Sequence, residues 1–477
     1  MKSKIFTLVT SLCLCMFSSC DKNFEAINTD PNRLESVRPE TLLAPILLNS
    51  TNALLSRSHR INHELMQYSV QINVMQEFHR YVFRATEFDY MWNHLYRWAG
   101  NASDMYNLAN DIGDRNNMAI ALIVKAWLMA ALTDIYGDIP YKDAFKGAEK
   151  VYFPSFDEQR DIYASLLDEL EEANGLIDVN ATYNAANDPL FGGNLLKWKK
   201  FSNSLRLRFL VRVSNRSEMD APARINELFA DPATFPIMAS SDDGAVFKYT
   251  GVNPYVNILF QLRDFDFRGD RRMGSTFVNL LNKTSDPRRD LIMSRNRVGE
   301  FVGVESGQPV GITASLADNA GEGTSTYLTA LQAANQPAYL LTYPEVLFNL
   351  AEAAQKGWIE ADAESLYTEA VEEAVRQWGI QPAPEFMGGT YVAYNGTFEQ
   401  LMEQKYLALF FVGFESWSEY RRTGLPTLFK GTGTDNGGRM PNRFEYPVIV
   451  KATNRENVEV AAQRMGGDNL NSPMWWQ

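Results

Sequence analysis

The sequence predicts a mainly α-helical protein, in which tetratricopeptide-like helical hairpins form a scaffold and a large irregular, loop-rich face lies against them. Three observations support this fold class. Several segments carry apolar residues at the helical period of 3.6 and have recognisable ends. One pair of such segments is joined by a very short turn. Long stretches between the helices show weak periodicity of either kind.

The helical segments differ in how much of their surface is apolar. Residues 156–175 carry an apolar stripe opposite acidic side chains, which predicts a surface helix with Gly175 at its end. Residues 118–132 are apolar nearly all round, interrupted only by Lys125, and are too short to span a membrane. They therefore predict a buried helix. Further helices are expected at residues 197–214 and 398–412.

The clearest pair of helices lies later in the chain. Pro344 starts a helix over residues 345–356, which Gly357 ends, and Asp362 opens a second helix that runs to Gly379. So short a turn makes an antiparallel hairpin of the tetratricopeptide type. No 34-residue period repeats along the chain, so we expect hairpins embedded in a larger irregular fold. The loop-rich stretches are residues 231–274, 295–336, 382–396 and 431–443.

The N-terminus resembles an export signal followed by a lipid attachment site. Lys2 and Lys4 precede a short apolar run, and Cys20 follows two serines, as in the lipobox of bacterial lipoproteins. We expect a signal peptide at residues 1–19 and a single domain at residues 20–477. Cys20 is the expected lipidation site, and acyl chains such as palmitate would anchor it in a membrane. The other cysteines, Cys13 and Cys15, precede the cleavage point, which excludes disulfides in the mature chain.

The charge balance argues against nucleic acid as a partner. Loss of Lys2 and Lys4 with the signal changes the formal net charge from −13 to −15. So acidic a chain is repelled by phosphate backbones and by anionic lipid headgroups. We therefore expect contact with a membrane through the lipid anchor only.

The motifs of common enzyme classes are missing. The sequence contains no G-x-S-x-G elbow, no Walker loop and no G-x-G-x-x-G fingerprint. We therefore expect no catalytic residues, no cofactor and no enzyme. Glycoside hydrolysis stays open as an alternative, because it needs only two suitably spaced carboxylates.

Three side-chain clusters raise the question of a metal or anion site. His59 and His63 stand one helical turn apart but lack the glutamate of a zinc protease motif, so we interpret them as polar residues on a helix and expect no metal. Asp264, Asp266 and Asp270 could supply oxygen ligands to calcium, although their spacing is not that of an EF-hand. A third cluster is expected to pair with carboxylates and consists of Arg208, Arg212 and Arg216.

Aromatic residues make up 12% of the chain, and many fall in segments without helical periodicity. Flat aromatic faces stack on the apolar faces of sugar rings, whereas the ordinary alternative is that each ring packs on the body of the protein. The candidate ligand-binding residues are Tyr249, Tyr255, Phe265, Phe267, Tyr327, Tyr391 and Tyr394.

Several fragments in a fixed order resemble the SusD/RagB-like nutrient-binding outer-membrane lipoproteins. None is specific alone, but together they extend over nearly the whole mature chain. The fragments are residues 24–32 (FEAINTDPN), 197–208 (KWKKFSNSLRLR), 343–353 (YPEVLFNLAEA), 404–406 (QKY), 415–422 (ESWSEYRR) and the final tryptophans 475–476.

The resemblance implies a helical scaffold with a ligand-binding loop face, anchored in the outer membrane and exposed at the cell surface. It also implies a SusC-like TonB-dependent transporter as partner, to which the protein would deliver a glycan or peptide. Only Cys20 carries over by motif, since the family's ligand contacts lie in variable loops. Two alternatives remain, a lipid-anchored carbohydrate hydrolase and a mainly structural subunit of the transporter.

Overall fold

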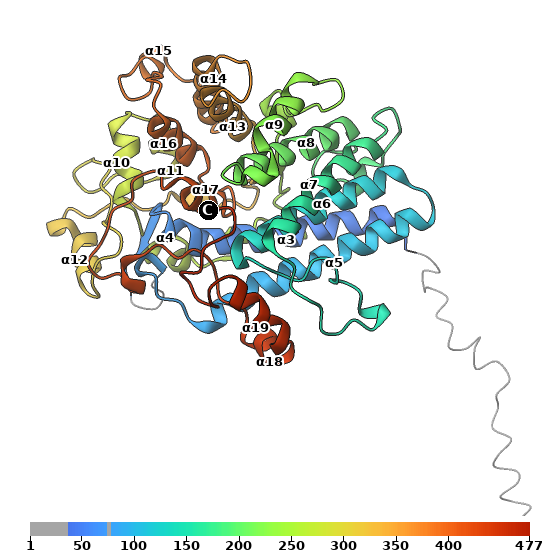
Figure 1. Ribbon diagram of the computed structural model, residues 1–477. Helices are drawn as coiled ribbons and strands as arrows, with labels where there is room; N and C mark the ends of the chain where they lie inside the picture. The colour runs from blue at the N-terminus through green and yellow to red at the C-terminus, as the bar shows by residue number, and fades with distance from the viewer. Residues whose placement is uncertain (1–36, 74–77) are drawn as a thin grey trace, which may run out of the picture. The chain divides into compact units, whose positions relative to one another are not determined.

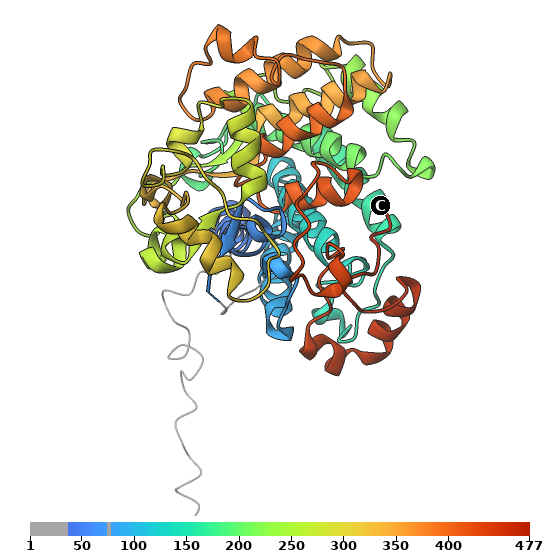
Figure 2. The same cartoon turned by 90° about the vertical axis from the view of Figure 1, so that its left-hand side faces the viewer.

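The computed structural model describes residues 37–73 and 78–477, and residues 39–477 form one compact unit. This unit is mainly helical, with antiparallel helices packed side by side on one flank and loops gathered on the other (Figures 1 and 2). The principal helices are α3 (Leu43–Arg57), α5 (Asp89–Asp111), α6 (Arg115–Tyr136), α7 (Gln159–Leu176), α8 (Leu195–Arg212), α9 (Ala221–Ala230), α13 (Tyr343–Gln355), α14 (Ala363–Arg376), α16 (Phe398–Ala408) and α17 (Glu415–Thr423).

Consecutive helices pack as hairpins, which confirms the predicted fold class. Helices α5 to α8 each pack against the next one along the chain, and α13 packs against α14. Asp114 caps α6 by accepting from the backbone N–H of Asn117 at 3.1 Å, and Asp362 caps α14 as the sequence predicts. Gly137 ends α6 with φ of +81°, and a Cβ there would lie 2.6 Å from the sulfur of Met465.

Helix α6 is the buried helix that the sequence predicts. Among the described residues it is the one helix that is long and apolar enough to cross a membrane. However, 83% of its apolar stretch is buried inside the protein. The helix therefore forms the centre of the hydrophobic core, between α5 and α7.

The structure corrects some helix boundaries. Helix α7 continues past Gly175 to Leu176, and α16 ends at Ala408, although its periodicity extends to Val412. The chain turns at Phe411, whose φ is +65°, because its ring and that of Phe410 pack on His63 in the core. The predicted loops also contain the short helices α12 (Ile312–Asp318) and α15 (Pro384–Met387).

The loop-rich flank is tied together by two small antiparallel sheets. Their strands come from distant parts of the sequence, so they are not hairpins. The first sheet pairs β1 (Ser69–Gln71) with β3 (Arg271–Met273), and the second pairs β2 (Ala245–Phe247) with β4 (Ala338–Leu341). The remaining elements on this flank are α4 (His63–Leu65), α10 (Ser275–Lys283) and α11 (Arg289–Ile292). Helices α18 (Val448–Thr453) and α19 (Arg455–Arg464) follow α17 in the chain and lie at the lower edge in Figure 1.

A network of buried ion pairs joins α6, α8, α13, α16 and α17. Arg208 donates from Nε and Nη2 to the two carboxylate oxygens of Glu345, at 2.6 Å each. One helical turn later, Arg212 pairs with Asp134 and, at 2.5 Å, with Glu415. The predicted pairing with carboxylates is confirmed for Arg208 and Arg212. Arg216 instead donates to the main-chain oxygen of Gln477 at 2.9 Å and lies over the ring of Trp475.

The same network continues through α16 and α17. Glu419 accepts hydrogen bonds from Lys405 and Arg422 at 2.7 Å each, and Arg422 also donates to both oxygens of Glu352 at 2.7 and 2.6 Å. Arg421 donates to the backbone carbonyl of Asp134 at 2.7 Å. The network is balanced in charge, because its members are Arg208, Arg212, Lys405, Arg421, Arg422, Asp134, Glu345, Glu352, Glu415 and Glu419.

Ion pairing controls the protonation of the buried carboxyls. Burial alone would raise the pKa of Glu419, but the charges of Arg422, Lys405 and Arg212 hold it well below its usual value. In Glu345, by contrast, burial raises the pKa and Arg208 offsets only part of the shift. The charged form of Glu419 is therefore strongly favoured by the fold.

Replacing one cation of this network is expected to destabilise the protein strongly. Arg422→Met leaves Glu352, whose side chain is fully buried, without its bidentate partner. Loss of one partner of a buried pair costs about 3–5 kcal/mol in the free energy of unfolding. Urea denaturation of the soluble chain from Asp21 onward measures this change.

The matched control for that substitution is Arg455→Met. The Arg455 side chain is 78% exposed and pairs with Glu459 across one turn of α19. Its replacement is expected to leave the urea midpoint unchanged. Equal effects of the two substitutions would contradict the assignment of stability to the buried network.

The stability of the protein is expected to fall in acid through Glu419. A carboxyl whose pKa is lower in the folded state stabilises the fold above its unfolded pKa of about 4.3, and this contribution is lost as the pH falls toward the folded pKa. Thermal midpoints should therefore drop below about pH 4. Glu419→Gln should lower the midpoint at neutral pH and flatten this acid dependence, and an unchanged slope would exclude Glu419 as its source.

Candidate functional site

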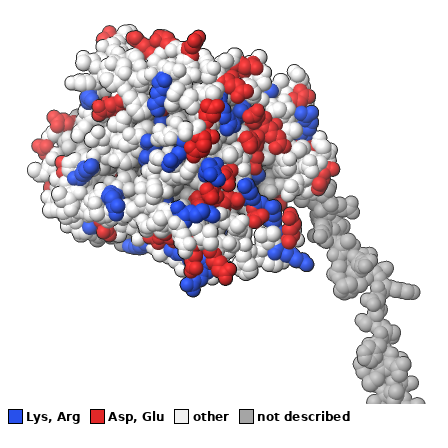
Figure 3. All heavy atoms as spheres, in the orientation of Figure 1, with Lys and Arg blue, Asp and Glu red and all other residues white. Residues whose placement is uncertain are grey.

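Charged side chains are unevenly distributed over the surface. In the view of Figure 3 they crowd over the helical flank on the right and are sparse over the loop-rich flank on the left. The acidic character of the chain is therefore concentrated on the scaffold in this view. The loop flank offers a more neutral surface to a ligand.

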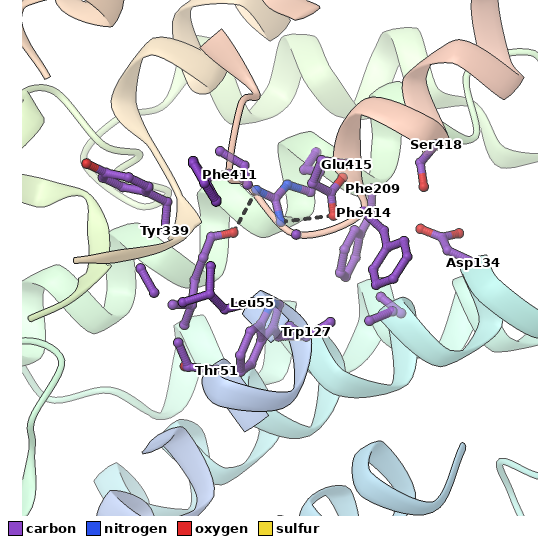
Figure 4. Close-up of a pocket in the computed structure, with 18 residues that line it drawn as sticks. Thr51, Leu55, Trp127, Asp134, Phe209, Tyr339, Phe411, Phe414, Glu415 and Ser418 are labelled. Atoms are coloured by element: carbon purple, nitrogen blue, oxygen red, sulfur yellow. Dashed lines mark hydrogen bonds and ion pairs between the residues drawn. The ribbon is translucent and has the colours of Figure 1, made fainter. Parts of the chain in front are cut away.

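A small cavity lies at the ion-pair network and does not have the size needed for an oligosaccharide. It is bounded by side chains of α3, α6, α8 and α17, with Arg208 between Glu415 and the carbonyl of Leu340 (Figure 4). Its volume is about 40 Å³, which is room for about one water molecule. This cavity belongs to the structural network and is not a ligand site.

An open groove on the loop-rich flank has the size of a ligand site. Its volume is about 450 Å³, within the usual range for small-molecule sites. One wall comes from the turn before β3, a second from the loop around Arg297 and a third from α12 and the segment after it. The lining residues that carry polar side chains are Asp264, Arg268, Arg272, Arg297, Asp318, Thr324 and Thr326.

A second hollow, of about 410 Å³, lies among α5, α6 and α7 on the scaffold. Its central cation, Lys125, pairs with Glu169 at 2.7 Å. The groove is the stronger candidate because it lies on the flank where several predicted aromatic residues are found, and because not all of its cations are neutralised.

The aspartates considered for calcium have protein partners instead. Asp264 accepts from Arg268 at 2.5 Å, Asp266 accepts from Arg263 at 2.6 and 2.8 Å, and Asp270 accepts from Gln71 at 2.6 Å. Within residues 37–73 and 78–477, no group of three or more histidine, cysteine or acidic residues is placed to hold a metal ion.

Of the seven predicted aromatic residues, Phe265 alone lies exposed beside the groove. Its side chain is 52% exposed, and its ring lies 3.4 Å from the position of a Cβ on Gly269, which lines the groove. Phe267 and Tyr327 come from the same walls but are fully buried, where a ligand does not reach them. Phe267 and Tyr327 are therefore core residues.

The buried pair of aromatic residues explains the two histidines. Phe267 stacks on His59 at 5.0 Å, and Tyr327 shares a 2.8 Å hydrogen bond with Nδ1 of His63. Burial lowers the pKa of both histidines well below the usual value, so both are neutral. They belong to the core beneath the groove and do not lie on an exposed helical face.

The other four predicted residues lie away from the groove lining. Tyr249 is buried and donates to Asn52 at 2.6 Å, and Tyr255 is half-buried near Phe247. The remaining two flank α15 and α16, where Tyr391 is 52% exposed and Tyr394 packs on Tyr367. The seven residues thus do not form a single site.

The arginines of the groove were not predicted from the sequence. The signal was present as four arginines within residues 263–272, but sequence alone does not tell which of them pairs with a carboxylate. Arg263 and Arg268 pair with aspartates on their own turn, and Arg271 pairs with the buried Glu64 at 2.6 Å. Arg272 has no such partner among the described residues, and its Nη1 donates to the carbonyls of Gly269 and Arg271.

The predicted signal peptide, the lipidation site Cys20 and the opening fragment 24–32 lie outside the described residues. The later fragments lie in the described part of the chain, and four of them meet at the ion-pair network. Residues 197–208 supply Arg208, and residues 343–353 supply Glu345 and Glu352. Residues 404–406 supply Lys405, and residues 415–422 supply Arg422. These motifs therefore serve the scaffold.

Comparisons with known proteins agree with this scaffold. No curated protein matches the sequence. Three similar solved structures are a SusD homolog from Bacteroides uniformis (TM-score 0.80, 22% identity, 93% of this chain and 99% of that one), a chitin-binding SusD homolog from Flavobacterium johnsoniae (TM-score 0.78, 21% identity, 92% and 98%), and a Bacteroides vulgatus protein described as a candidate outer-membrane protein for nutrient binding (TM-score 0.80, 25% identity, 92% and 100%).

A family model described as starch-binding and associating with the outer membrane matches residues 31–447. This match covers most of the sequence and includes both the ion-pair network and the groove. The chain therefore belongs to the SusD-like family of outer-membrane-associated binding proteins.

Proposed function

We propose that this protein is a lipid-anchored, cell-surface lipoprotein that captures a glycan in the groove and delivers it to a SusC-like TonB-dependent transporter. The observation that carries the proposal is the groove itself, an open polar site beside an exposed aromatic ring on a SusD-like scaffold. The family description and the chitin-binding relative support a glycan as the ligand.

The groove is better suited to binding sugar than to cleaving it. Asp264 is held by Arg268, and Asp318 accepts from the backbone N–H of Gly321 at 3.0 Å, so both carboxylates of the lining already have partners. Carboxyls whose pKa is raised by burial include Asp134 and Glu345, which lie in the ion-pair network. A general acid for glycoside hydrolysis needs a raised pKa at the substrate, and these two groups are elsewhere.

Removing the exposed ring beside the groove is expected to weaken glycan binding. Phe265→Ala should reduce the binding free energy by about 1 kcal/mol or more, because an aromatic face stacks on a sugar ring. Isothermal titration calorimetry measures this with the glycan that binds tightest on an array of neutral and acidic oligosaccharides. The matched control is Tyr391→Ala, since Tyr391 is equally exposed at 52% but lies away from the groove lining. If Tyr391→Ala lost affinity and Phe265→Ala did not, the glycan site would instead lie on the surface around α15 and α16.

The proposed partner is tested by co-purification. With the native lipidated protein as bait in detergent-solubilised outer membrane, we expect a large TonB-dependent barrel to be recovered and identified by mass spectrometry. An unrelated outer-membrane lipoprotein serves as the control bait. Recovery of no barrel from an intact preparation would contradict delivery to a transporter and favour a free-standing binder.

A mainly structural role makes a different prediction in the same system. In that case deletion of the protein would abolish uptake, while Phe265→Ala and other groove substitutions would leave uptake unchanged. Reduced uptake in the groove variants supports direct capture.

A further inference from the structure

Two arginines of the groove, the half-buried Arg272 and the exposed Arg297, differ from the other cations described above. The cations of the ion-pair network face carboxylates, and Arg268 is neutralised by Asp264. Within the described part of the chain, however, Arg272 and Arg297 have backbone carbonyls as their hydrogen-bond partners and form no ion pair. Both line the same groove.

The environment of Arg272 leaves its charge poorly compensated. Burial lowers the pKa of Arg272, and the charge of Asp270 offsets only part of that shift. A guanidinium carries five N–H donors in a planar fork, and the two backbone bonds of Arg272 both involve Nη1. Donors therefore remain for a ligand, and an anionic group would replace the solvation that burial removes.

The groove is locally positive in a strongly acidic protein. Its lining contains Arg268, Arg272 and Arg297 against Asp264 and Asp318, whereas the whole chain carries a formal charge of −13. An anionic ligand is repelled by the molecule as a whole, so a local positive site is needed to hold it. Guanidinium groups bind carboxylate and sulfate through paired hydrogen bonds, which gives both affinity and orientation.

The rest of the lining favours a sugar as the carrier of that anionic group. The oxygens of Thr324 and Thr326 donate to backbone carbonyls, at 3.1 Å for Thr324 and 2.9 Å for Thr326, and remain free to accept from sugar hydroxyls. Phe265 supplies an exposed ring at the edge. We propose that the groove binds an acidic glycan segment, whose carboxylate or sulfate group is held by Arg272 and Arg297. This inference rests on the proposed function of the groove and specifies its ligand class.

The test compares matched ligands that differ in charge. The probes are hexagalacturonate, its fully methyl-esterified form, a sulfated hexasaccharide and neutral chitohexaose, each titrated by calorimetry at low and high salt. We expect the tighter of the two acidic probes to bind about tenfold or more tightly than the neutral ones, and its affinity to fall with added salt. Tighter binding of hexagalacturonate would identify the preferred anionic group as a carboxylate, and tighter binding of the sulfated hexasaccharide would identify it as a sulfate.

The variants are Arg272→Gln and Arg297→Gln, with Arg295→Gln as the control. Arg295 stands in the same loop as Arg297 but pairs with Asp290 at 2.9 Å and lies over the ring of Phe301, outside the groove lining. Each groove variant should lose about tenfold in affinity for the acidic probe, whereas the control should stay within about twofold. Arg297 is exposed, so its variant keeps the test valid even where Arg272→Gln disturbs β3.

The possible failures can be told apart. Equal binding of hexagalacturonate and its ester, or unchanged affinity in both groove variants, would overturn the acidic-glycan assignment. The proposed function would survive that result if Phe265→Ala still weakened the neutral glycan. Hexaglutamate that bound as tightly as the acidic probes would overturn the assignment to sugar. Failure of every probe to bind would count against both the ligand class and glycan capture in the groove.

Discussion

The buried ion-pair network is the constraint on which the rest of this structure depends. It connects helices from the early, middle and late parts of the chain, through Arg208 with Glu345, Arg212 with Asp134 and Arg422 with Glu352. Charges are costly to bury, so each is tolerated only where its partner is held in place. Hydrogen-bonded partners of the network lie up to 287 residues apart, as for Arg421 and the carbonyl of Asp134. The network is therefore satisfied only when the whole scaffold has assembled. We infer that it contributes to the uniqueness of the fold as much as to its stability.

A second set of buried polar contacts connects the groove to that scaffold. Arg271, at the start of β3, donates to the fully buried Glu64 at 2.6 Å, and Tyr327 bonds His63 beneath the other wall. Both partners lie just before β1, which pairs with β3. The walls are therefore fixed from below by residues that never reach the ligand. The exposed side chains of the groove, such as Phe265 and Arg297, take no part in these buried contacts.

The sequence predicted what depends on local pattern and missed what depends on distant partners. Helix α6 and the α13 and α14 hairpin follow from periodicity and caps, which are local. The strands β1 and β3 are three residues long each, and their pairing joins positions about 200 residues apart, so neither period nor turn chemistry reveals them. Likewise the spacing of Arg208 and Arg212 predicted carboxylate partners but not their identity.

The candidate site shows the same limit at the scale of single side chains. Phe265 and Phe267 are two residues apart in a segment with no regular period, yet one is 52% exposed and the other is fully buried. The segment is a single π-helical turn, Phe265–Gly269, in which exposure is set by what packs beneath it, here His59. Arg268 and Arg272 present the same problem, since the paired and the unpaired arginine look alike in sequence.

An open groove also fits a protein that passes its ligand on. A hydrolase gains from enclosing its substrate and excluding water, whereas this groove is bounded on three sides and opens to solvent. A site of ordinary affinity, with a dissociation constant of about 1 μM and an association rate constant of about 10⁶ M⁻¹ s⁻¹, would release its ligand about once per second. For the proposed delivery to a transporter, retention on that scale is long enough to raise the local concentration of ligand and short enough to release it. A few exposed contacts at the edge of a rigid scaffold suit that balance better than a deep enclosed pocket.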